Sequence, residues 1–103
     1  MPIERDAFYS MLGIARRAGA LTLGTDGVLG TIASGSAALV LLDAAASENT
    51  KKRFHDSCAF HGTPLFETAP ERLGLAIGKP GRMCAAAARG TLGDKLYALA
   101  QQG

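Results

Sequence analysis

The sequence predicts an α/β fold: a three-layer α/β/α sandwich around a small, mixed four-stranded sheet, with the element order αβαβαβαβα. Two observations favour this class. Short apolar runs alternate along the chain with segments of helical periodicity, which is typical of strands joined through helices. The apolar run 38–42 lacks polar alternation, as expected of a central strand covered by helices on both faces. At 103 residues, the chain fits one domain over 1–103.

The first elements follow from apolar spacing and glycine positions. Asp6 is the predicted N-cap of a helix whose apolar face recurs at i, i+3, i+4 and i+7: Phe8, Met11, Leu12 and Ala15. Residues 21–23 predict a short strand. Thr25 is the predicted N-cap of a second helix, which occupies the glycine-rich stretch 24–35. That stretch is therefore a strand-to-helix junction.

The middle of the chain predicts a third helix after the central strand. Ser47 is its expected N-cap and Gly62 its expected end. Within it, Glu48 and Asp56 each lie four residues from Lys52, a spacing that favours ion pairs on one helix face.

The last elements are a strand, a helix, a strand and a helix. Residues 63–66 predict a strand near a sheet edge, because Pro64 cannot donate to a central ladder. Thr68 and Glu71 have the spacing of a capping box, which predicts a fourth helix to about residue 77. Residues 83–88 predict a buried strand. Thr91 is the expected N-cap of a final helix that buries Leu92, Leu96 and Leu99.

Cysteine count and hydropathy bear on the compartment. One disulfide, Cys58–Cys84, is conceivable. Two cysteines without a secretory segment nevertheless favour buried, reduced thiols in a cytoplasmic protein. The polar N-terminus is unlike a signal peptide, and the longest apolar run is broken by Asp43. No membrane association is expected.

The sequence gives little support for a metal site or a catalytic site. His55, Cys58 and His61 are metal-ligand types at spacings of three, but helical geometry puts the two histidines about 120° apart. A core Cys58 flanked by surface histidines is therefore predicted, with no metal site. No nucleophile elbow or paired carboxylates are evident, so no catalytic residues and no enzyme are predicted.

The glycines at 24, 27 and 30 form a GxxGxxG pattern at the strand-to-helix junction. Backbone N–H groups at a helix start attract phosphate. The pattern is neither a dinucleotide fingerprint nor a P-loop, so no nucleotide cofactor is predicted. The structural alternative is that these glycines permit a tight turn and close packing.

The net charge is only +2, so the positions of the basic residues are more informative than their number. The cluster Lys51-Lys52-Arg53 is most simply a solvated helix face. Lys79 and Arg82 differ, because they flank a glycine on a loop expected near the second helix start. Cations beside free amides suit an RNA backbone, and without an aromatic platform a structured RNA fits best.

The sequence resembles the L7Ae/L30e ribosomal protein family, particularly its bacterial L7Ae-like (YlxQ-type) RNA-binding members. The resemblance covers nearly the whole chain. It is carried by FYSMLGIARRAGALTLGTDGV, SGSAALVLLDAAASENTKK, LGLAIGKPGRMCAAAARG and GDKLYAL. It implies an L30e-like sandwich that binds RNA, in several relatives a kink-turn, through the second helix start and the loop before the last strand.

Kink-turn binders of the family read Gly-Thr-Asn-Glu-x-x-Lys at the second helix. Gly24 and Thr25 match, whereas Asp26, Gly27 and Gly30 stand at the asparagine, glutamate and lysine positions. Aspartate accepts hydrogen bonds from guanine but repels phosphate, and the missing lysine removes one phosphate contact. We therefore expect this protein to bind RNA more weakly than the kink-turn binders do, or to bind a different RNA.

The sequence thus predicts a non-enzymatic, cytoplasmic RNA-binding protein whose partner is ribosomal or kink-turn-like structured RNA, with the ribosome as a further partner and no DNA expected. The expected RNA-binding residues are Gly24, Thr25, Asp26, Gly27, Lys79 and Arg82, with Arg17 and Lys51 as weaker candidates. Two alternatives stay open: a protein-interaction module on the same scaffold, and a small phosphate- or nucleotide-binding protein.

Overall fold

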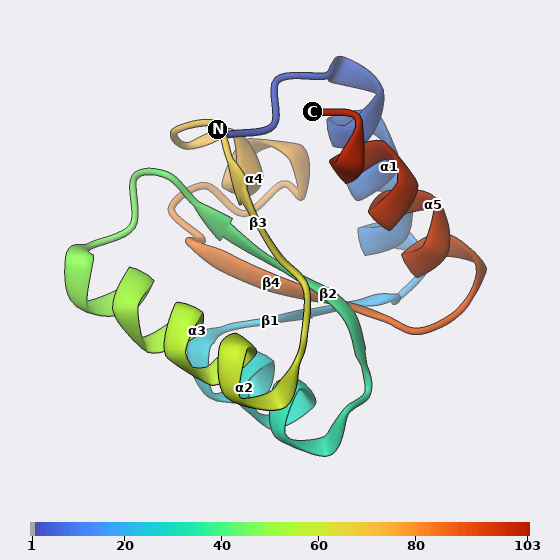
Figure 1. Ribbon diagram of the computed structural model, residues 1–103. Helices are drawn as coiled ribbons and strands as arrows, with labels where there is room; N and C mark the ends of the chain where they lie inside the picture. The colour runs from blue at the N-terminus through green and yellow to red at the C-terminus, as the bar shows by residue number, and fades with distance from the viewer. Residues whose placement is uncertain (1) are drawn as a thin grey trace.

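The centre of the molecule is one sheet with the strand order β1-β4-β2-β3 (Figure 1). A computed structural model describes residues 2–103. The strands are β1 (Leu21–Leu23), β2 (Ala37–Asp43), β3 (Leu65–Thr68) and β4 (Cys84–Ala88). β2 pairs in parallel with β3 and antiparallel with β4, which also pairs antiparallel with β1. The predicted mixed four-stranded sheet with a central second strand is confirmed.

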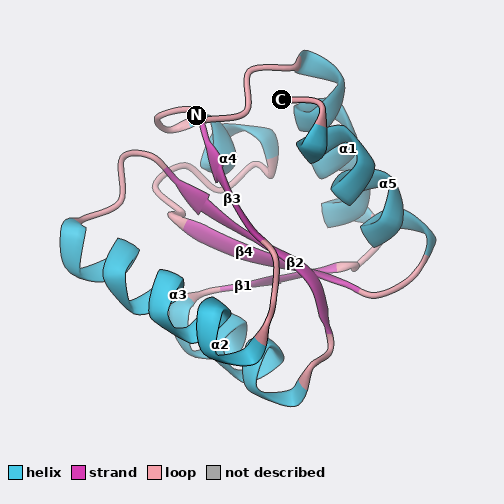
Figure 2. Ribbon diagram, in the orientation of Figure 1, coloured by secondary structure: helices cyan, strands magenta, loops and turns pink. Residues whose placement is uncertain are grey.

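Helices cover both faces of this sheet (Figure 2). One layer holds α1 (Asp6–Arg17), α4 (Arg72–Ala76) and α5 (Thr91–Gln101), and the other holds α2 (Thr25–Ser34) and α3 (Glu48–His61). Alternate residues of β2 serve the two cores. Leu39 and Leu41 pack in the core of the first layer, while Val40 and Leu42 pack in the core of the second. The three-layer α/β/α sandwich is therefore confirmed.

Three predicted N-caps are wrong. The caps of α1, α2 and α5 are Arg5, Gly24 and Gly90, and none uses a side-chain hydrogen bond. Asp6, Thr25 and Thr91 instead begin the helices they were expected to precede. Gly24 (φ 89°) and Gly90 (φ 139°) turn the chain into α2 and α5 through backbone angles that favour glycine.

The predicted limits of α3 are correct. Oγ of Ser47 accepts a hydrogen bond from the Thr50 N–H at 3.2 Å, and Gly62 ends the helix with φ 70°. Lys52 and Asp56 form the expected ion pair at 2.8 Å. The other expected pair is wrong, because Glu48 lies 4.0 Å from Lys51 rather than pairing with Lys52.

The predicted capping box of α4 is also wrong. Thr68 ends β3 and is fully buried, where its hydroxyl donates to Oδ2 of Asp43. Glu71 is the N-cap with φ 65° and makes no side-chain cap. The Asp43 carboxylate replaces the box, and a partner so distant in sequence leaves no local spacing signal. β3 is the predicted edge strand, but it begins two residues later than expected, after Pro64.

Both cysteines are free and buried, as the sequence favoured. His55 and His61 are exposed on either side of the buried Cys58, which is the predicted arrangement. Across residues 2–103, no three potential metal-ligand side chains converge. In that same part of the chain, no helix has the length and apolar character needed to cross a bilayer.

Candidate functional site

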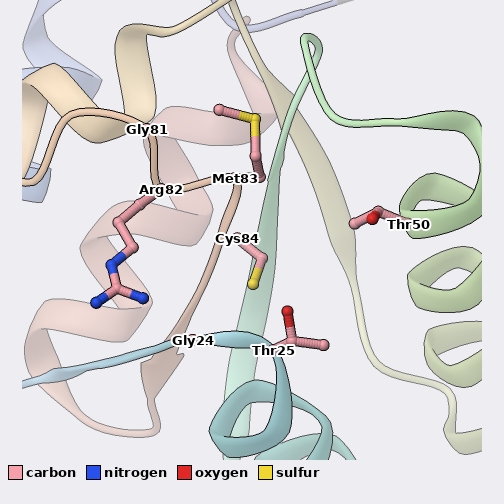
Figure 3. A pocket seen from close by; sticks show the side chains of 7 residues that line it. All are labelled: Gly24, Thr25, Thr50, Gly81, Arg82, Met83 and Cys84. Atoms are coloured by element: carbon pink, nitrogen blue, oxygen red, sulfur yellow. The ribbon is translucent and has the colours of Figure 1, made fainter.

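A hollow of about 230 Å³ opens where β1 turns into α2, beside the first turn of α3 and the loop before β4 (Figure 3). Its lining comes from three parts of the chain: Gly24, Thr25, Thr50, Gly81, Arg82, Met83 and Cys84. The strand-to-helix junction and the loop 78–83 were expected to be neighbours. The structure confirms that they are.

The junction supplies uncapped backbone. Gly24 has φ 89° and ψ 145°, and its carbonyl accepts the Val28 N–H at 3.0 Å, which begins the hydrogen-bond ladder of α2. The N–H groups before Val28 have no intrahelical acceptor, and no side chain caps them. The positive end of the helix dipole is therefore available to an acceptor beside the hollow.

The loop supplies a cation at the same place. The Arg82 N–H donates to the Lys79 carbonyl at 3.2 Å, which closes a turn containing Gly81 at φ 91°. Arg82 is exposed, and a Cβ atom added at Gly24 would lie 3.8 Å from its Nη1. A guanidinium thus lies against the backbone that leads into α2.

The floor of the hollow is uncharged. Cys84 is buried, and its sulfur and the Thr25 hydroxyl face each other (Figure 3). Burial raises the pKa of the Cys84 thiol, while the hydrogen bond with Thr25 and the charge of Arg82 lower it in part. The net upward direction keeps the thiol protonated at neutral pH, so the charge in the lining comes from Arg82.

Three of the eight expected binding residues line the hollow together: Gly24, Thr25 and Arg82. Asp26 and Gly27 lie in the exposed first turn of α2 just beyond it. Lys79 is exposed at the start of the turn that presents Arg82.

The two weaker candidates lie farther out. Lys51 follows Thr50 of the lining, and its side chain is 23% exposed with the ammonium 4.0 Å from Glu48. Arg17 ends α1, in the helix layer on the opposite face of the sheet, and precedes the end of β1 that is remote from Gly24. The structure does not bring Arg17 to the hollow.

The four other lining residues were not among the expected binding residues: Thr50, Gly81, Met83 and Cys84. Gly81 and Met83 lie in the loop 78–83 that was expected beside the junction, whereas Cys84 was expected only as a strand residue and Thr50 as part of a helix. Their proximity depends on the packing of α2 against α3 and of α2 against β4. Nothing in the local pattern signals those contacts.

The other two glycines of the GxxGxxG pattern differ in their surroundings. A Cβ atom at Gly27 would lie 2.9 Å from Cγ2 of Thr22, so this glycine permits α2 to approach β1 closely. A Cβ atom at Gly30 would meet nothing within 4 Å. Close packing therefore explains Gly27 but not Gly30.

Comparison with known proteins now decides the family. The family model for the ribosomal protein L7Ae/L30e/S12e/Gadd45 family matches residues 6–97. The chain belongs to this family.

Curated L7Ae-family relatives include two bacterial proteins named RNA-binding protein YlxQ. The Bacillus subtilis (strain 168) protein is 34% identical over 93 residues, covering 89% of this chain and 93% of the relative. The Enterococcus faecium protein is 35% identical over 78 residues, covering 75% of this chain and 76% of the relative.

Solved structures agree with the L7Ae-family fold. A protein of unknown function from Bacillus halodurans C superposes with a TM-score of 0.86 at 32% identity, covering 94% of this chain and 99% of the other. The Giardia lamblia 15.5kD RNA binding protein superposes with a TM-score of 0.77 at 19% identity, covering 99% and 92%. The second likeness concerns the fold alone.

Proposed function

We propose that this L7Ae-family protein is a non-enzymatic RNA-binding protein that contacts a structured RNA at the hollow between the start of α2 and the loop before β4. One observation carries the proposal. The Arg82 guanidinium lies beside Gly24, where the uncapped first turn of α2 begins. Cation and amide donors from distant parts of the chain thus meet at one place, as a phosphate or a base edge requires.

The chemistry favours contact with the RNA backbone. Arginine is suited to phosphate because its planar fork donates two parallel hydrogen bonds. The lining adds small residues, and Gly24 allows close approach of a ligand to the main chain. The YlxQ relatives are named RNA-binding proteins, which agrees with this role.

The first turns of α2 lack side chains that kink-turn binders carry. Asp26 is exposed in the first turn of α2, and Gly27 and Gly30 carry no side chain where kink-turn binders carry glutamate and lysine. We therefore propose that amides near residues 24–27 and the Arg82 guanidinium contact the RNA. Lys79 adds charge nearby, with Lys51 and Arg17 at the periphery. The proposed partners are ribosomal or kink-turn-like RNA and the ribosome, in the cytoplasm.

A binding titration tests the proposal. A kink-turn stem-loop, a ribosomal RNA fragment and a plain duplex are titrated against the protein over a series of salt concentrations. We expect one of the two structured RNAs to bind more tightly than the duplex, and its affinity to fall linearly with salt on a double-logarithmic plot. Equal affinity for all three RNAs, or affinity independent of salt, would contradict the proposal.

A protein-interaction module is the second candidate, because α2 lacks the family lysine and Phe60 is 84% exposed. Protein partners that remain bound after nuclease treatment in a pull-down would favour this module over RNA binding.

A nucleotide or phosphate site at the glycine junction is the third candidate function, and it predicts a thermal shift with millimolar nucleotide. Absence of that shift would remove it.

A further inference from the structure

The loop that presents Arg82 is held by a buried acidic residue on the central strand. Asp43 ends β2 and is fully buried. Its Oδ1 accepts the N–H groups of Ala45 and Glu71 at 2.9 and 2.8 Å, and its Oδ2 accepts the Leu73 N–H and the Thr68 hydroxyl, both at 3.2 Å. Two of these four donors belong to the start of α4.

Asp43 also binds Met83, the residue that follows Arg82. Its own N–H donates to the carbonyl of Met83 at 2.8 Å. The segment that carries Lys79 and Arg82 leaves α4 and returns to the sheet at Met83. Both the helix before the segment and the residue after it are therefore hydrogen-bonded to one amino acid.

Gly74 supports the loop between these two ends. Its carbonyl accepts the Lys79 N–H at 2.8 Å. A Cβ atom at this position would lie 2.8 Å from the Lys79 carbonyl oxygen, 2.9 Å from the Gly81 nitrogen and 3.1 Å from Cα of Pro80. All three are backbone atoms, so any larger residue must push the turn away from α4.

The arrangement includes unusual backbone. Glu71 has φ 65°, a conformation that L-residues adopt at a cost, and its N–H is one of the Asp43 donors. In residues 2–103, Asp43 belongs to no ion pair with Lys, Arg or His, so its carboxylate is stabilised by N–H and O–H donors. A buried carboxylate in such a site fixes the start of α4 relative to Met83.

We infer that Asp43 and Gly74 are positioning residues for Arg82: Asp43 ties the start of α4 and Met83 to the central strand, Gly74 supports the turn between them, and together they hold the guanidinium beside Gly24. The inference rests on the proposed function for its binding readout, but the loop geometry is testable without RNA. Neither residue touches the hollow. Both act through the turn that begins at Lys79.

A double-mutant cycle tests the inference. Arg82→Ala, Gly74→Ala and the double variant are compared for affinity and salt dependence toward the structured RNA bound by the wild type. Gly74→Ala is expected to lose about as much as Arg82→Ala, roughly tenfold in affinity and about one unit of salt slope. The double variant is expected to be no worse than either single variant. If the two losses multiply instead, Gly74 does not act through Arg82.

Asp43→Asn extends the test should Gly74→Ala not fold. The substitution keeps the size of the side chain but places an NH₂ group against an N–H donor. We expect faster amide hydrogen exchange at Lys79 and Arg82, and a reduced cost of adding Arg82→Ala. Leu96→Ala is the control, because Leu96 is buried on α5 and its truncation lowers stability without removing a hydrogen bond of the loop. It should leave the cost of Arg82→Ala unchanged.

The outcomes separate the two proposals. If the wild type binds no structured RNA, the proposed function fails, while loop exchange still tests the positioning. If Arg82→Ala weakens binding equally in the wild type and in the Asp43→Asn and Gly74→Ala proteins, the positioning role fails and RNA binding stands. Unchanged exchange at Lys79 and Arg82 in Asp43→Asn would also overturn the positioning role.

Discussion

Arg82 lies against Gly24, although one precedes the last strand and the other follows the first. A Cβ atom at Gly24 would lie 3.8 Å from Nη1 of Arg82. This relationship joins a positive charge to the uncapped start of α2, where the first-turn amides have no acceptor within the helix. It defines the hollow.

Arg82→Ala should weaken RNA binding about tenfold, because a hydrogen-bonded charge contact contributes about 1.5 kcal/mol. The slope of log affinity against log salt should fall by about one unit. Fluorescence anisotropy across a salt series measures both quantities. Lys95→Ala is the matched control, since Lys95 is exposed on α5 in the other helix layer. Equal effects of the two variants would show that only net charge matters.

Gly24→Ala should destabilise the protein and weaken RNA binding together. The angles φ 89° and ψ 145° are unfavourable for an L-residue by about 1–3 kcal/mol, so the start of α2 must shift. Gly35→Ala is the control, because Gly35 also has positive φ (73°) but lies at the other end of α2. Urea denaturation should show a loss for both, and only Gly24→Ala should lose affinity. Unchanged affinity in Gly24→Ala would contradict the role of this backbone.

Gly30→Ala and Gly27→Ala should differ although both glycines are exposed in α2. Alanine at position 30 meets open space, so it should raise stability by about 0.5–1 kcal/mol through helix propensity. Alanine at position 27 would place its Cβ 2.9 Å from Cγ2 of Thr22, which offsets that gain. Thermal denaturation of the two variants measures the difference. An equal gain in both would show that Thr22 moves aside freely.

Gly30→Lys should strengthen binding to a kink-turn RNA. The position is open, and the added ammonium supplies one more phosphate contact on the second turn of α2. We expect a steeper salt dependence by about one unit and a higher affinity. Gly30→Gln controls for the longer side chain without the charge. A gain that is equal in the glutamine variant would not be electrostatic.

Cys58 should make stability depend on alkaline pH. Burial raises the pKa of its thiol from 9.0 to about 11, so the thiol of the unfolded chain loses its proton first, and this ionisation stabilises the unfolded state as the pH rises. The stability contribution is complete below pH 9 and is lost between pH 9 and about 11. At about pH 10 the loss is about 1 kcal/mol.

Urea denaturation at about pH 8 and about pH 10 measures this effect. Cys58→Ala should be less stable than the wild type at the lower pH because it leaves a small cavity. Its further loss on raising the pH should be smaller by about 1 kcal/mol. Tyr9, whose pKa burial also raises, is present in both proteins and cancels in the comparison. The same pH dependence in both proteins would contradict the assignment.

Much of the fold was predictable because its signals are local. The apolar run of β2 and the cap Ser47 with the terminator Gly62 of α3 all act within a few residues. The expected neighbourhood of the glycine junction and the loop 78–83 followed from a general rule for α/β folds. The errors at Asp6, Thr25 and Thr91 share one cause, since backbone angles at a preceding residue started these helices without a side-chain cap.

The sequence by itself determined the layer order, the central strand and the place of the basic loop. Apolar periodicity and turn residues define each element locally, and general rules for α/β folds arrange the elements. Only the tertiary structure decided that Asp43 replaces the Thr68–Glu71 capping box and binds both the start of α4 and Met83. It also decided that Arg82 reaches Gly24 while Arg17 does not. These relationships are contacts between residues far apart in the chain, and they form only when the sheet and its two helix layers have packed.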